Sequence, residues 1–330
     1  STPGWGWASN NSIKVRNNEI PKSAIVGSLL KGEPGFVNMD LLPMGRLDGE
    51  TYPVDQPVGV NPCAEAQLEH AELCCLFEIV LPRQKDIEDF EANCRLSLLA
   101  SKLVQGLATP WEQTNIVVAR NRRVGISVTG VTDSLDSVED KEGFWELLRH
   151  GYSVIRRYDT SLSRKLNIPE SVRKTVVKPS GSVSLLAGVS PGAHWSVGGN
   201  AYFRTIRFSA QDPIVTNLVA AGYRVEEDQV APETYVVYFP IIADVKRSDL
   251  DVPLEEKLDV AVNLQRHWAD QAVSLTASLD PSLWTPETLM EVTKRYIKEL
   301  KCISYLPSLG GDPYPQAPYQ PASKKDLKGK

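Results

Sequence analysis

The fold is decided by residues 61–82, which read NPCAEAQLEHAELCCLFEIVLP. The stretch opens as a loop without helical or strand periodicity that carries Cys63, and it closes on the continuous apolar run LFEIVLP (Leu76–Pro82). An apolar run of this length that ends at a proline is typical of a buried strand. Cys74 and Cys75 directly precede the run, so three of the five cysteines of the chain lie in this one stretch.

Helices and strands alternate on both sides of this strand. Apolar residues spaced along one face indicate a helix over residues 85–107, and Thr285 followed by Pro286 marks the start of another helix. Further helices are predicted at residues 22–31, 141–165, 213–221 and 254–270, and further strands at residues 123–131, 200–208, 234–239, 273–280 and 302–307. The alternation predicts an α/β fold with a largely parallel sheet, in one domain over residues 1–310, followed by a Pro-rich, basic and mobile tail over residues 311–330.

Composition and charge exclude several classes of protein. The 330 residues are 42% hydrophobic and 23% charged, as in ordinary globular proteins, and the formal net charge of -5 argues against direct nucleic-acid binding. No apolar run is long enough to span a bilayer and no signal peptide opens the chain, so we expect a cytoplasmic protein. The chain begins STPGWGW without an initiator methionine, and we expect a processed chain or one piece of a larger enzyme.

Two other cysteines are predicted to pack in the core. Cysteine is among the most buried residue types, Cys94 lies on the apolar face of a predicted helix, and Cys302 opens a predicted strand. A zinc site is not supported, because the sequence has no CxxC pair. Nor do the four histidines show a ligand spacing with a cysteine; they are His70, His150, His194 and His267.

Cys63 has a different setting from these core cysteines. Asn61, Cys63 and Glu65 occupy alternate positions, and in an extended segment they would point together into one pocket. The three side chains offer a thiol, an amide and an acid–base group. A thiolate nucleophile normally has a histidine beside it, and only His70 is near, which disfavours a cysteine hydrolase. The pattern fits a thiol that donates and accepts a hydrogen atom.

A second candidate site is the stretch KPSGSVS (Lys178–Ser184), which lies between the strand-like KTVV and a predicted helix start. A strand that feeds a Gly/Ser turn into a helix directs unpaired N–H groups and the helix dipole at one spot, which suits an anion. Gly181 permits close approach of the backbone, and Ser180, Ser182 and Ser184 can donate hydrogen bonds. The same residues fit an N-capped structural turn equally well, and the spacing of a P-loop is absent.

Five ordered segments give the chain a family resemblance that spans nearly its whole length. They are NPCAE with Cys74 eleven positions later, LFEIVLP, RNRRVGISVTGVTD, KPSGSVSLLAGVSPGAHW and LKCISYLPSLGGDPYPQAPY. In this order they resemble ribonucleotide reductases, and the chain is most similar to the adenosylcobalamin-dependent, class II enzymes of the monomeric, phage-like type. The resemblance implies the C-terminal half of a ten-stranded α/β barrel, with a central finger loop that contains NPCAE.

The resemblance implies a role for each side chain of the finger loop. Cys63 resembles the thiyl-radical cysteine that abstracts the ribose 3′-hydrogen, and Glu65 resembles the base that takes the 3′-hydroxyl proton as the 2′-hydroxyl leaves as water. Asn61 resembles the amide that hydrogen-bonds the 2′/3′ region of the substrate. Cys74 matches one member of the redox pair that reduces the substrate radical and becomes a disulfide. Cys75 stands where the family commonly has a polar residue, and we expect it to pack or to be a spare thiol.

Phosphate binding and the radical source also follow from the resemblance. The family segment that matches KPSGSVS holds the nucleotide phosphates, which favours the anion site and implies this role for Ser180, Gly181, Ser182 and Val183. Class I enzymes relay a radical through adjacent tyrosines, but the matching pair here is Ser304 and Tyr305. Class III enzymes use a glycyl-radical motif unlike the Pro-rich run at 310–311 and generally lack the loop glutamate. Adenosylcobalamin (vitamin B12 coenzyme) is therefore the expected cofactor.

The redox cysteines depart from the family pattern. No cysteine precedes Cys63, although the family has its second redox cysteine on an early strand, and the tail lacks the cysteine pair found in many relatives. We expect a ribonucleotide substrate, a thioredoxin-like or dithiol reductant, and an N-terminal reductase chain that supplies the other half-barrel and the second redox cysteine. The alternative is a catalytically incompetent nucleotide-binding or assembly subunit that keeps the fold.

Overall fold

The computed structural model describes residues 11–49, 55–243, 245–308, 316–322 and 327. Their contacts gather into two compact units. The larger unit falls within residues 1–194 and 253–307, and the smaller one within residues 195–252 and 308–330. The division that the sequence suggests, one domain over residues 1–310 and a tail, stays a prediction.

The larger unit is built around strands that run in two directions. Its strands are β1 (Ser12–Val15), β2 (Gly35–Asn38), β3 (Gly59–Val60), β4 (Gln67–Leu68), β5 (Cys75–Val80), β6 (Val124–Thr129), β10 (Thr276–Leu279) and β11 (Cys302–Pro307). β5 pairs with β6 and β10 with β11, each in parallel, as the alternation of strands and helices predicts. β1 and β2 are also parallel to each other, but β2 runs antiparallel to β11. Two sets of parallel strands therefore meet at the β2–β11 pair.

The parallel strands from β5 to β11 follow one another almost continuously. Ile126 in β6 forms a bridge to Thr175, and Val177 forms a bridge to Val273, just before β10. The segment at 175–177 thus lies between β6 and β10 and takes the place of a strand. The resulting order is β5, β6, 175–177, β10, β11, β2 and β1. This order agrees with the α/β half-barrel that the sequence predicts.

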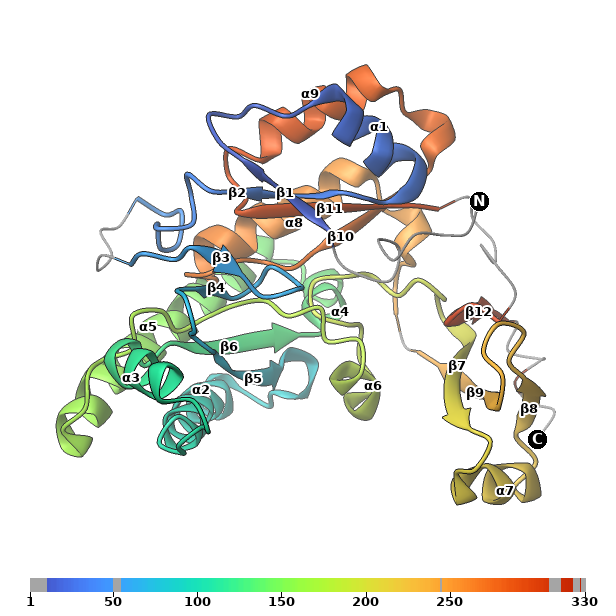
Figure 1. Cartoon of the computed structure of the whole chain (residues 1–330), viewed down its shortest axis with the longest axis horizontal. Coiled ribbons are helices and arrows are strands. Elements are labelled where there is room, and N and C mark those ends of the chain that lie inside the picture. The colour runs from blue at the N-terminus through green and yellow to red at the C-terminus, as the bar shows by residue number, and fades with distance from the viewer. Residues whose placement is uncertain (1–10, 50–54, 244, 309–315, 323–326, 328–330) are drawn as a thin grey trace. The chain divides into compact units, whose positions relative to one another are not determined.

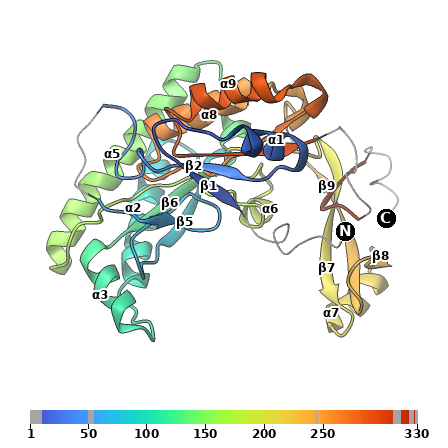
Figure 2. The same cartoon turned by 45° about the horizontal axis from the view of Figure 1, so that its top comes forward.

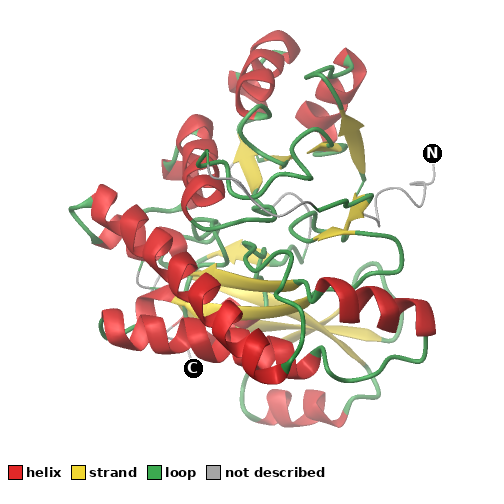
Figure 3. Cartoon of the chain, turned by 90° about the vertical axis from the view of Figure 1, so that its left-hand side faces the viewer, coloured by secondary structure: helices red, strands yellow, loops and turns green. Residues whose placement is uncertain are grey.

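Helices cover the outer side of these strands. They are α1 (Lys22–Lys31), α2 (Ile87–Val104), α3 (Glu112–Asn121), α4 (Val131–Ser137), α5 (Lys141–Leu166), α6 (Val183–Ala187), α8 (Leu254–His267) and α9 (Pro286–Tyr296). α2 packs on β5 and β6, while α1 packs on β11 and α9 (Figure 1, Figure 2). The helices, red in Figure 3, flank the strands, whereas the β3–β4 hairpin lies between β2 and β6 in Figure 1. Within the described residues, no helix is long and apolar enough to cross a membrane.

Two helix starts show how local sequence determines the elements. The Thr285 side chain accepts a hydrogen bond from the backbone N–H of Thr288, and Pro286 takes the first helical position, so α9 begins where predicted. The carboxylate of Asp86 accepts a hydrogen bond from the N–H of Asp89 at 2.8 Å and starts α2. α2 confirms the helix predicted over residues 85–107, shortened at both ends.

Some elements were not predicted. α3 follows Trp111, which provides no side-chain cap, although Thr109 and Pro110 precede it and Glu112 lies in its first turn. Residues 319–321, predicted to belong to a mobile tail, form strand β12 (Tyr319–Pro321) instead. The Tyr319 ring packs against Tyr202, with the ring centroids 5.6 Å apart, and lies under the guanidinium of Arg204. This packing outweighs the Pro-rich composition; residues 311–315, 323–326 and 328–330 lie outside the described part of the tail.

The smaller unit contains an antiparallel sheet. Its strands lie in the order β12, β7 (Ala201–Ser209), β9 (Thr234–Ile242) and β8 (Arg224–Glu227), and α7 (Pro213–Ala220) connects β7 to β8. The strands predicted at residues 200–208 and 234–239 and the helix predicted at 213–221 are confirmed. None of these pairings is parallel, so the largely parallel sheet predicted for the chain applies only to the larger unit.

Candidate active site

The finger loop, residues 59–68, is a hairpin that Asn61 closes. β3 and β4 pair antiparallel, with Val60 opposite Gln67, and residues 61–66 form the tip. The backbone N–H of Asn61 donates to the carbonyl of Ala66 at 3.0 Å. In return, the side-chain Oδ1 of Asn61 accepts a hydrogen bond from the N–H of Ala66 at 3.0 Å. Asn61 therefore sets the width of the hairpin through its carbonyl oxygen, and its amide NH₂ group is not used in this closure.

The tip is a tight turn rather than an extended segment. The N–H of Ala64 donates to the carbonyl of Asn61 at 2.9 Å, and Ala64 itself has a φ of +64°. This left-handed conformation is uncommon for alanine, and the position that adopts it carries neither of the residues, glycine or asparagine, that would signal it in the sequence. Residues two apart share a face only in an extended segment, so the prediction that Asn61, Cys63 and Glu65 point the same way does not hold across this turn. Any proximity of Cys63 to Glu65 comes from the turn itself.

Glu65 is buried and tied to the core through its backbone. Its carbonyl accepts a hydrogen bond from the N–H of Ala272 at 3.0 Å, which fixes the tip beside the residues that precede β10. Glu65 is only 2% exposed, and within the described residues its Oε2 has no hydrogen-bond partner. A buried polar atom without a partner costs free energy, so this oxygen is a candidate to receive a hydrogen bond or a proton from a bound ligand.

Cys63 is half-buried and keeps its proton at neutral pH. Burial raises the pKa of the Cys63 thiol above its ordinary value of 9.0, and the negative charge of Glu65 raises this pKa further. Nucleophilic cysteines have the opposite environment, with positive charge nearby that lowers the pKa. The neutral S–H form can give up a hydrogen atom, in agreement with the role inferred from the sequence.

Cys74 lies immediately before β5 and faces a glycine of the next strand. The parallel register places Cys75 opposite Val124, so Cys74 comes beside the start of β6. A Cβ atom on Gly125 would come within 3.1 Å of the Cys74 Sγ, so the glycine makes room for this thiol. Burial raises the pKa of Cys74, and the positive charge of Arg123 opposes the rise.

One glutamine links Cys74 to the finger loop. The Gln271 side chain hydrogen-bonds the Cys74 thiol, and its Oε1 accepts a hydrogen bond from the backbone N–H of Gln67 at 3.3 Å. Its Nε2 donates to the carbonyl of Val124 at 2.9 Å. Gln271 therefore connects β4, β6 and the predicted redox thiol, a contact that no sequence signal indicates because Gln271 lies far along the chain.

Gly125→Ala is expected to destabilise the larger unit by about 1–3 kcal/mol. The added methyl group would approach Leu76 Cδ2 to 2.5 Å and Cys74 Sγ to 3.1 Å, so these side chains must move from their present positions. Urea unfolding would measure the loss. Gly181→Ala is the matched control, because a Cβ there has no neighbour within 4 Å. Equal stability of the two variants would contradict close packing around Cys74.

Cys302, predicted to pack in the core, lies directly beneath the finger loop. It is buried in a cluster with Val37, Met39, Leu42, Ala64 and Ala272. Its Sγ is 3.2 Å from the carbonyl oxygen of Val273 and 3.9 Å from that of Ala64. Burial raises the pKa of Cys302 to about 12, with a smaller contribution from Glu65. Cys302 thus supports the tip, and Cys94 is buried as predicted.

All five cysteines are free thiols in the structure. Cys74 therefore forms no disulfide in this structure. Among the described residues, no group of three His, Cys, Asp or Glu side chains is arranged to hold a metal ion.

The candidate phosphate loop is anchored at one end and exposed at the other. Ser180 is buried with a φ of +56°, and its hydroxyl donates to the carboxylate of Glu78 in β5. The Nζ of Lys178 lies 3.2 Å from the other oxygen of the same carboxylate. The next three residues are exposed at the start of α6; they are Gly181, Ser182 and Val183. Ser180 thus holds the loop in place, while the exposed residues face solvent.

Two backbone hydrogen bonds bring the finger loop close to the phosphate loop. Ala272 donates its N–H to the carbonyl of Glu65 at 3.0 Å, and its own carbonyl accepts from the N–H of Val177 at 3.0 Å. Lys178, the first residue of the KPSGSVS stretch, follows Val177 directly. The structure therefore brings together the two regions in which the sequence predicts chemistry, although they lie more than a hundred residues apart.

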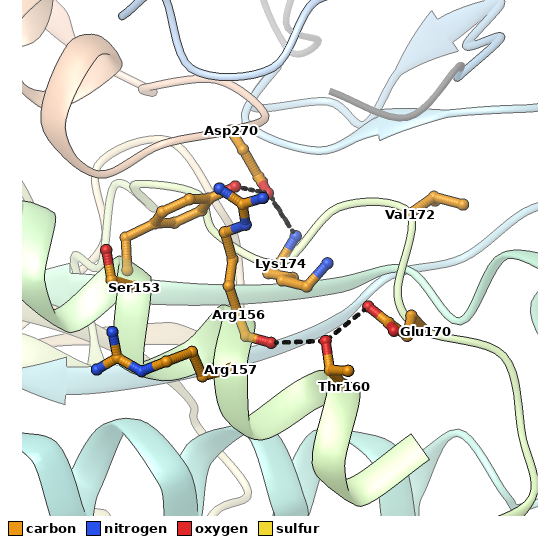
Figure 4. Close-up of a pocket in the computed structure, with 9 residues that line it drawn as sticks. Ser153, Arg156, Arg157, Thr160, Glu170, Val172, Lys174 and Asp270 are labelled. Carbon is orange, nitrogen blue, oxygen red and sulfur yellow. Dashed lines mark hydrogen bonds between the residues drawn. The ribbon is translucent and has the colours of Figure 1, made fainter. Parts of the chain in front are cut away.

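A separate pocket of about 370 Å³ contains none of the candidate residues (Figure 4). Tyr152, Ser153, Arg156, Arg157, Thr160, Glu170, Val172, Lys174 and Asp270 line it. Asp270 accepts hydrogen bonds from the backbone N–H groups of Lys174 and Thr175 and from the hydroxyl of Tyr152. Lys174 precedes the segment at 175–177, whereas the phosphate loop follows it. The pocket therefore lies at the opposite end of that segment from the candidate site.

Comparison with known proteins defines the class to which this fold belongs. No protein-family model matches the chain. A solved B12-dependent, class II ribonucleotide reductase matches with a TM-score of 0.84 and 31% identity, over 97% of this chain and 49% of that one. A class Id ribonucleotide reductase alpha subunit from Actinobacillus ureae shares the fold, with a TM-score of 0.65 and 15% identity, over 90% of this chain and 65% of that one. The chain is therefore similar to ribonucleotide reductases in sequence and in fold.

Curated relatives make the similarity more specific. The chain is 36% identical over 329 residues to an adenosylcobalamin-dependent ribonucleoside-triphosphate reductase of Euglena gracilis, and 33% identical over 353 residues to one of Lactobacillus acidophilus. It is thus a relative of the class II, adenosylcobalamin-dependent reductases, as the five sequence segments predict. Both matches cover 97% of this chain but only 44% and 47% of the relatives, so the chain spans less than half of their length.

Proposed function

We propose that this chain is the catalytic portion of a class II ribonucleotide reductase that acts on ribonucleoside triphosphates. One observation carries the proposal: the finger loop combines a protonated thiol, Cys63, with Glu65, whose buried Oε2 has no partner within the described residues. The triphosphate assignment is favoured by the names of the curated relatives. A cytoplasmic location is favoured by the five free thiols.

Each finger-loop residue has a chemical task in this proposal. Cys63, once oxidised to a thiyl radical, takes the hydrogen atom from the ribose 3′ carbon and returns it at the end. Glu65 accepts the proton of the 3′-hydroxyl while the 2′-hydroxyl leaves as water. The NH₂ group of Asn61 donates to the substrate hydroxyl region, since its carbonyl oxygen is already engaged with Ala66. Replacement of the 2′-hydroxyl by hydrogen oxidises two thiols to a disulfide, and Cys74 is one of them.

Adenosylcobalamin, when bound, supplies the radical that oxidises Cys63. The chain fits this chemistry because Cys63 is half-buried and so remains accessible, and because its pKa is raised, so the S–H bond is intact. The exposed residues Gly181, Ser182 and Val183 would hold the substrate phosphates at the start of α6, with Ser180 as the anchor of the loop.

A second polypeptide segment is part of the proposal. Within the described residues, β5 and β1 each have a strand on one side only. β5 exposes Leu76 and Phe77, and an apolar strand edge of this kind is a template for strand addition. We infer that an N-terminal reductase segment supplies the other half-barrel and the second redox thiol, and that a thioredoxin-like or dithiol reductant restores both thiols.

The test is complementation. The chain is mixed with the N-terminal portion of a class II relative, adenosylcobalamin, a dithiol and each ribonucleoside di- or triphosphate, and deoxynucleotide is measured. We expect product only when both polypeptides are present, and more of it from triphosphates. Robust product from the isolated chain would refute the need for a second segment.

One competing candidate is a catalytically incompetent nucleotide-binding or assembly subunit that keeps the fold. In the same experiment that candidate predicts ribonucleotide binding without any product, even in the presence of the N-terminal segment.

A further inference from the structure

A single guanidinium group holds the base of the finger loop. Arg123, just before β6, donates to both carboxylate oxygens of Asp55, with Nη1–Oδ2 at 2.9 Å and Nη2–Oδ1 at 2.7 Å. Its Nε lies 3.0 Å from Oε1 of Glu72. Asp55 precedes β3 and Glu72 follows β4. One side chain therefore contacts both the segment that enters the hairpin and the segment that leaves it.

The charged groups around Arg123 form a buried set, which we call the base cluster: Asp55, Glu72, Arg123 and Arg173. Each of these side chains is at most 1% exposed. The Nε of Arg173 lies 3.0 Å from Asp55 Oδ2, and its Nη2 donates to the carbonyl of Pro43. Two positive and two negative charges thus balance. Burial alone would raise the pKa of Asp55, but the hydrogen bonds and charges of Arg123 and Arg173 hold it below its usual value.

The base cluster also adjoins the predicted redox thiol. Arg123 precedes Val124, which pairs with Cys75, so Arg123 and Cys74 occupy neighbouring positions on adjacent strands. The positive charge of Arg123 acts on the Cys74 thiol. The same side chain therefore contacts both segments that flank the finger loop and neighbours the thiol at the start of β5.

Stability alone does not account for these buried charges. Apolar side chains of similar volume commonly stabilise a protein as well as a buried ion pair does, or better. What a bidentate arginine provides is a fixed geometry between the groups that it contacts. In the base cluster, those groups are the two segments that carry the hairpin.

We propose that Arg123 is a positioning residue that fixes the finger loop against β5 and β6, so that Cys63 and Glu65 keep one register relative to Cys74. The importance of this register for catalysis rests on the proposed reductase function. Whether Arg123 holds the finger loop in place does not depend on that function, and it can be tested without turnover.

The experiment compares the complete chain with its Arg123→Lys variant by amide hydrogen exchange over residues 58–68 and by the rate of Cys63 alkylation, resolved by mass spectrometry. Lysine keeps the positive charge but cannot contact both carboxylates in a fixed geometry. We expect exchange in the hairpin and Cys63 alkylation to rise by about tenfold or more, because local opening of the loop becomes easier.

Two control variants separate positioning from general stability. Arg120→Gln removes an ion pair with Glu69 on the same outgoing segment, but Arg120 is 58% exposed, and no change is expected. Leu148→Ala removes a fully buried side chain of α5 and lowers global stability away from the loop. At equal global stability, Arg123→Lys should open residues 58–68 more than Leu148→Ala does.

Equal exchange in these two variants, or unchanged hairpin exchange in a folded Arg123→Lys protein, would overturn the proposal. If Arg123→Lys does not fold, Glu72→Gln decides instead. It removes the charge paired with Arg123 but keeps a side-chain oxygen that can accept from the N–H of Glu69, and it should speed exchange in the outgoing segment. Failure of the proposed function gives a different result: the hairpin remains held by Arg123, but the complemented protein yields no deoxynucleotide.

Discussion

Cys63→Ser is expected to abolish deoxynucleotide formation by the complemented enzyme, with a loss of at least about 10³-fold. An alcohol O–H bond is much stronger than a thiol S–H bond, so serine at this position cannot pass a hydrogen atom to and from the ribose. The measurement is the rate of deoxynucleotide production from the ribonucleoside triphosphate with adenosylcobalamin and a dithiol.

The fold and the binding of nucleotide should survive this substitution. Cys63 is half-buried at the hairpin tip, and serine is nearly the same size. Cys75→Ser is the matched control, because Cys75 is also half-buried but is predicted to pack or to be a spare thiol, and we expect it to retain most of the activity. Full activity in Cys63→Ser would remove this thiol from the mechanism.

Glu65→Gln is expected to lower kcat by about 10²–10⁴-fold, the usual contribution of a general base. Glutamine keeps the size of the side chain but cannot accept the 3′-hydroxyl proton. Because the phosphate loop is untouched, KM for the ribonucleotide should change little. Steady-state kinetics of the complemented enzyme would measure both constants, and an unaltered kcat would exclude Glu65 as the base.

The same substitution has a consequence for Cys63 that does not depend on turnover. The negative charge of Glu65 is one of the two causes that raise the pKa of Cys63, so Glu65→Gln should lower that pKa. At any pH below the pKa, a larger fraction of the thiol is then ionised, and alkylation of Cys63 becomes faster. Glu69→Gln, which removes a charge paired with Arg120 instead, should leave the pH profile of alkylation unchanged.

Helices and strands are predicted well where neighbouring residues alone determine them. The Thr285–Pro286 start of α9 depends on neighbouring residues and is confirmed. The apolar run from Leu76 does form a strand, β5, but its predicted burial is wrong, because Leu76 and Phe77 are exposed at the edge of the described sheet. The NPCAE segment was placed correctly in a loop, but its conformation was not predicted. Ala64 adopts a left-handed φ that its residue type does not signal, so an extended segment was assumed where a turn exists.

Contacts between distant residues could not be predicted in this way. Arg123 joins Asp55 to Glu72, and Cys302 lies beneath Ala64, yet no spacing in the sequence relates these positions. The sequence does not distinguish a buried arginine from a solvent-exposed one; only the three-dimensional structure does. The hydrogen bond from Ser180 to Glu78 is not predictable for the same reason: the two residues are far apart in the sequence, and Glu78 lies within an apolar strand pattern.

The antiparallel pairing of β2 with β11 has a consequence for the order of assembly. The side chain of Asn38, at the end of β2, donates to the carbonyl of Ile297, 259 residues away along the chain. A ribosome extends the chain by about 5–20 residues per second, so this partner emerges long after β2 and the finger loop have been made. Ala272 and Cys302, which pack against Ala64 of the finger loop, are not both available until this later part of the chain has been made. Cys63, at the tip of the loop, is therefore among the last parts of the larger unit to reach its final position during synthesis.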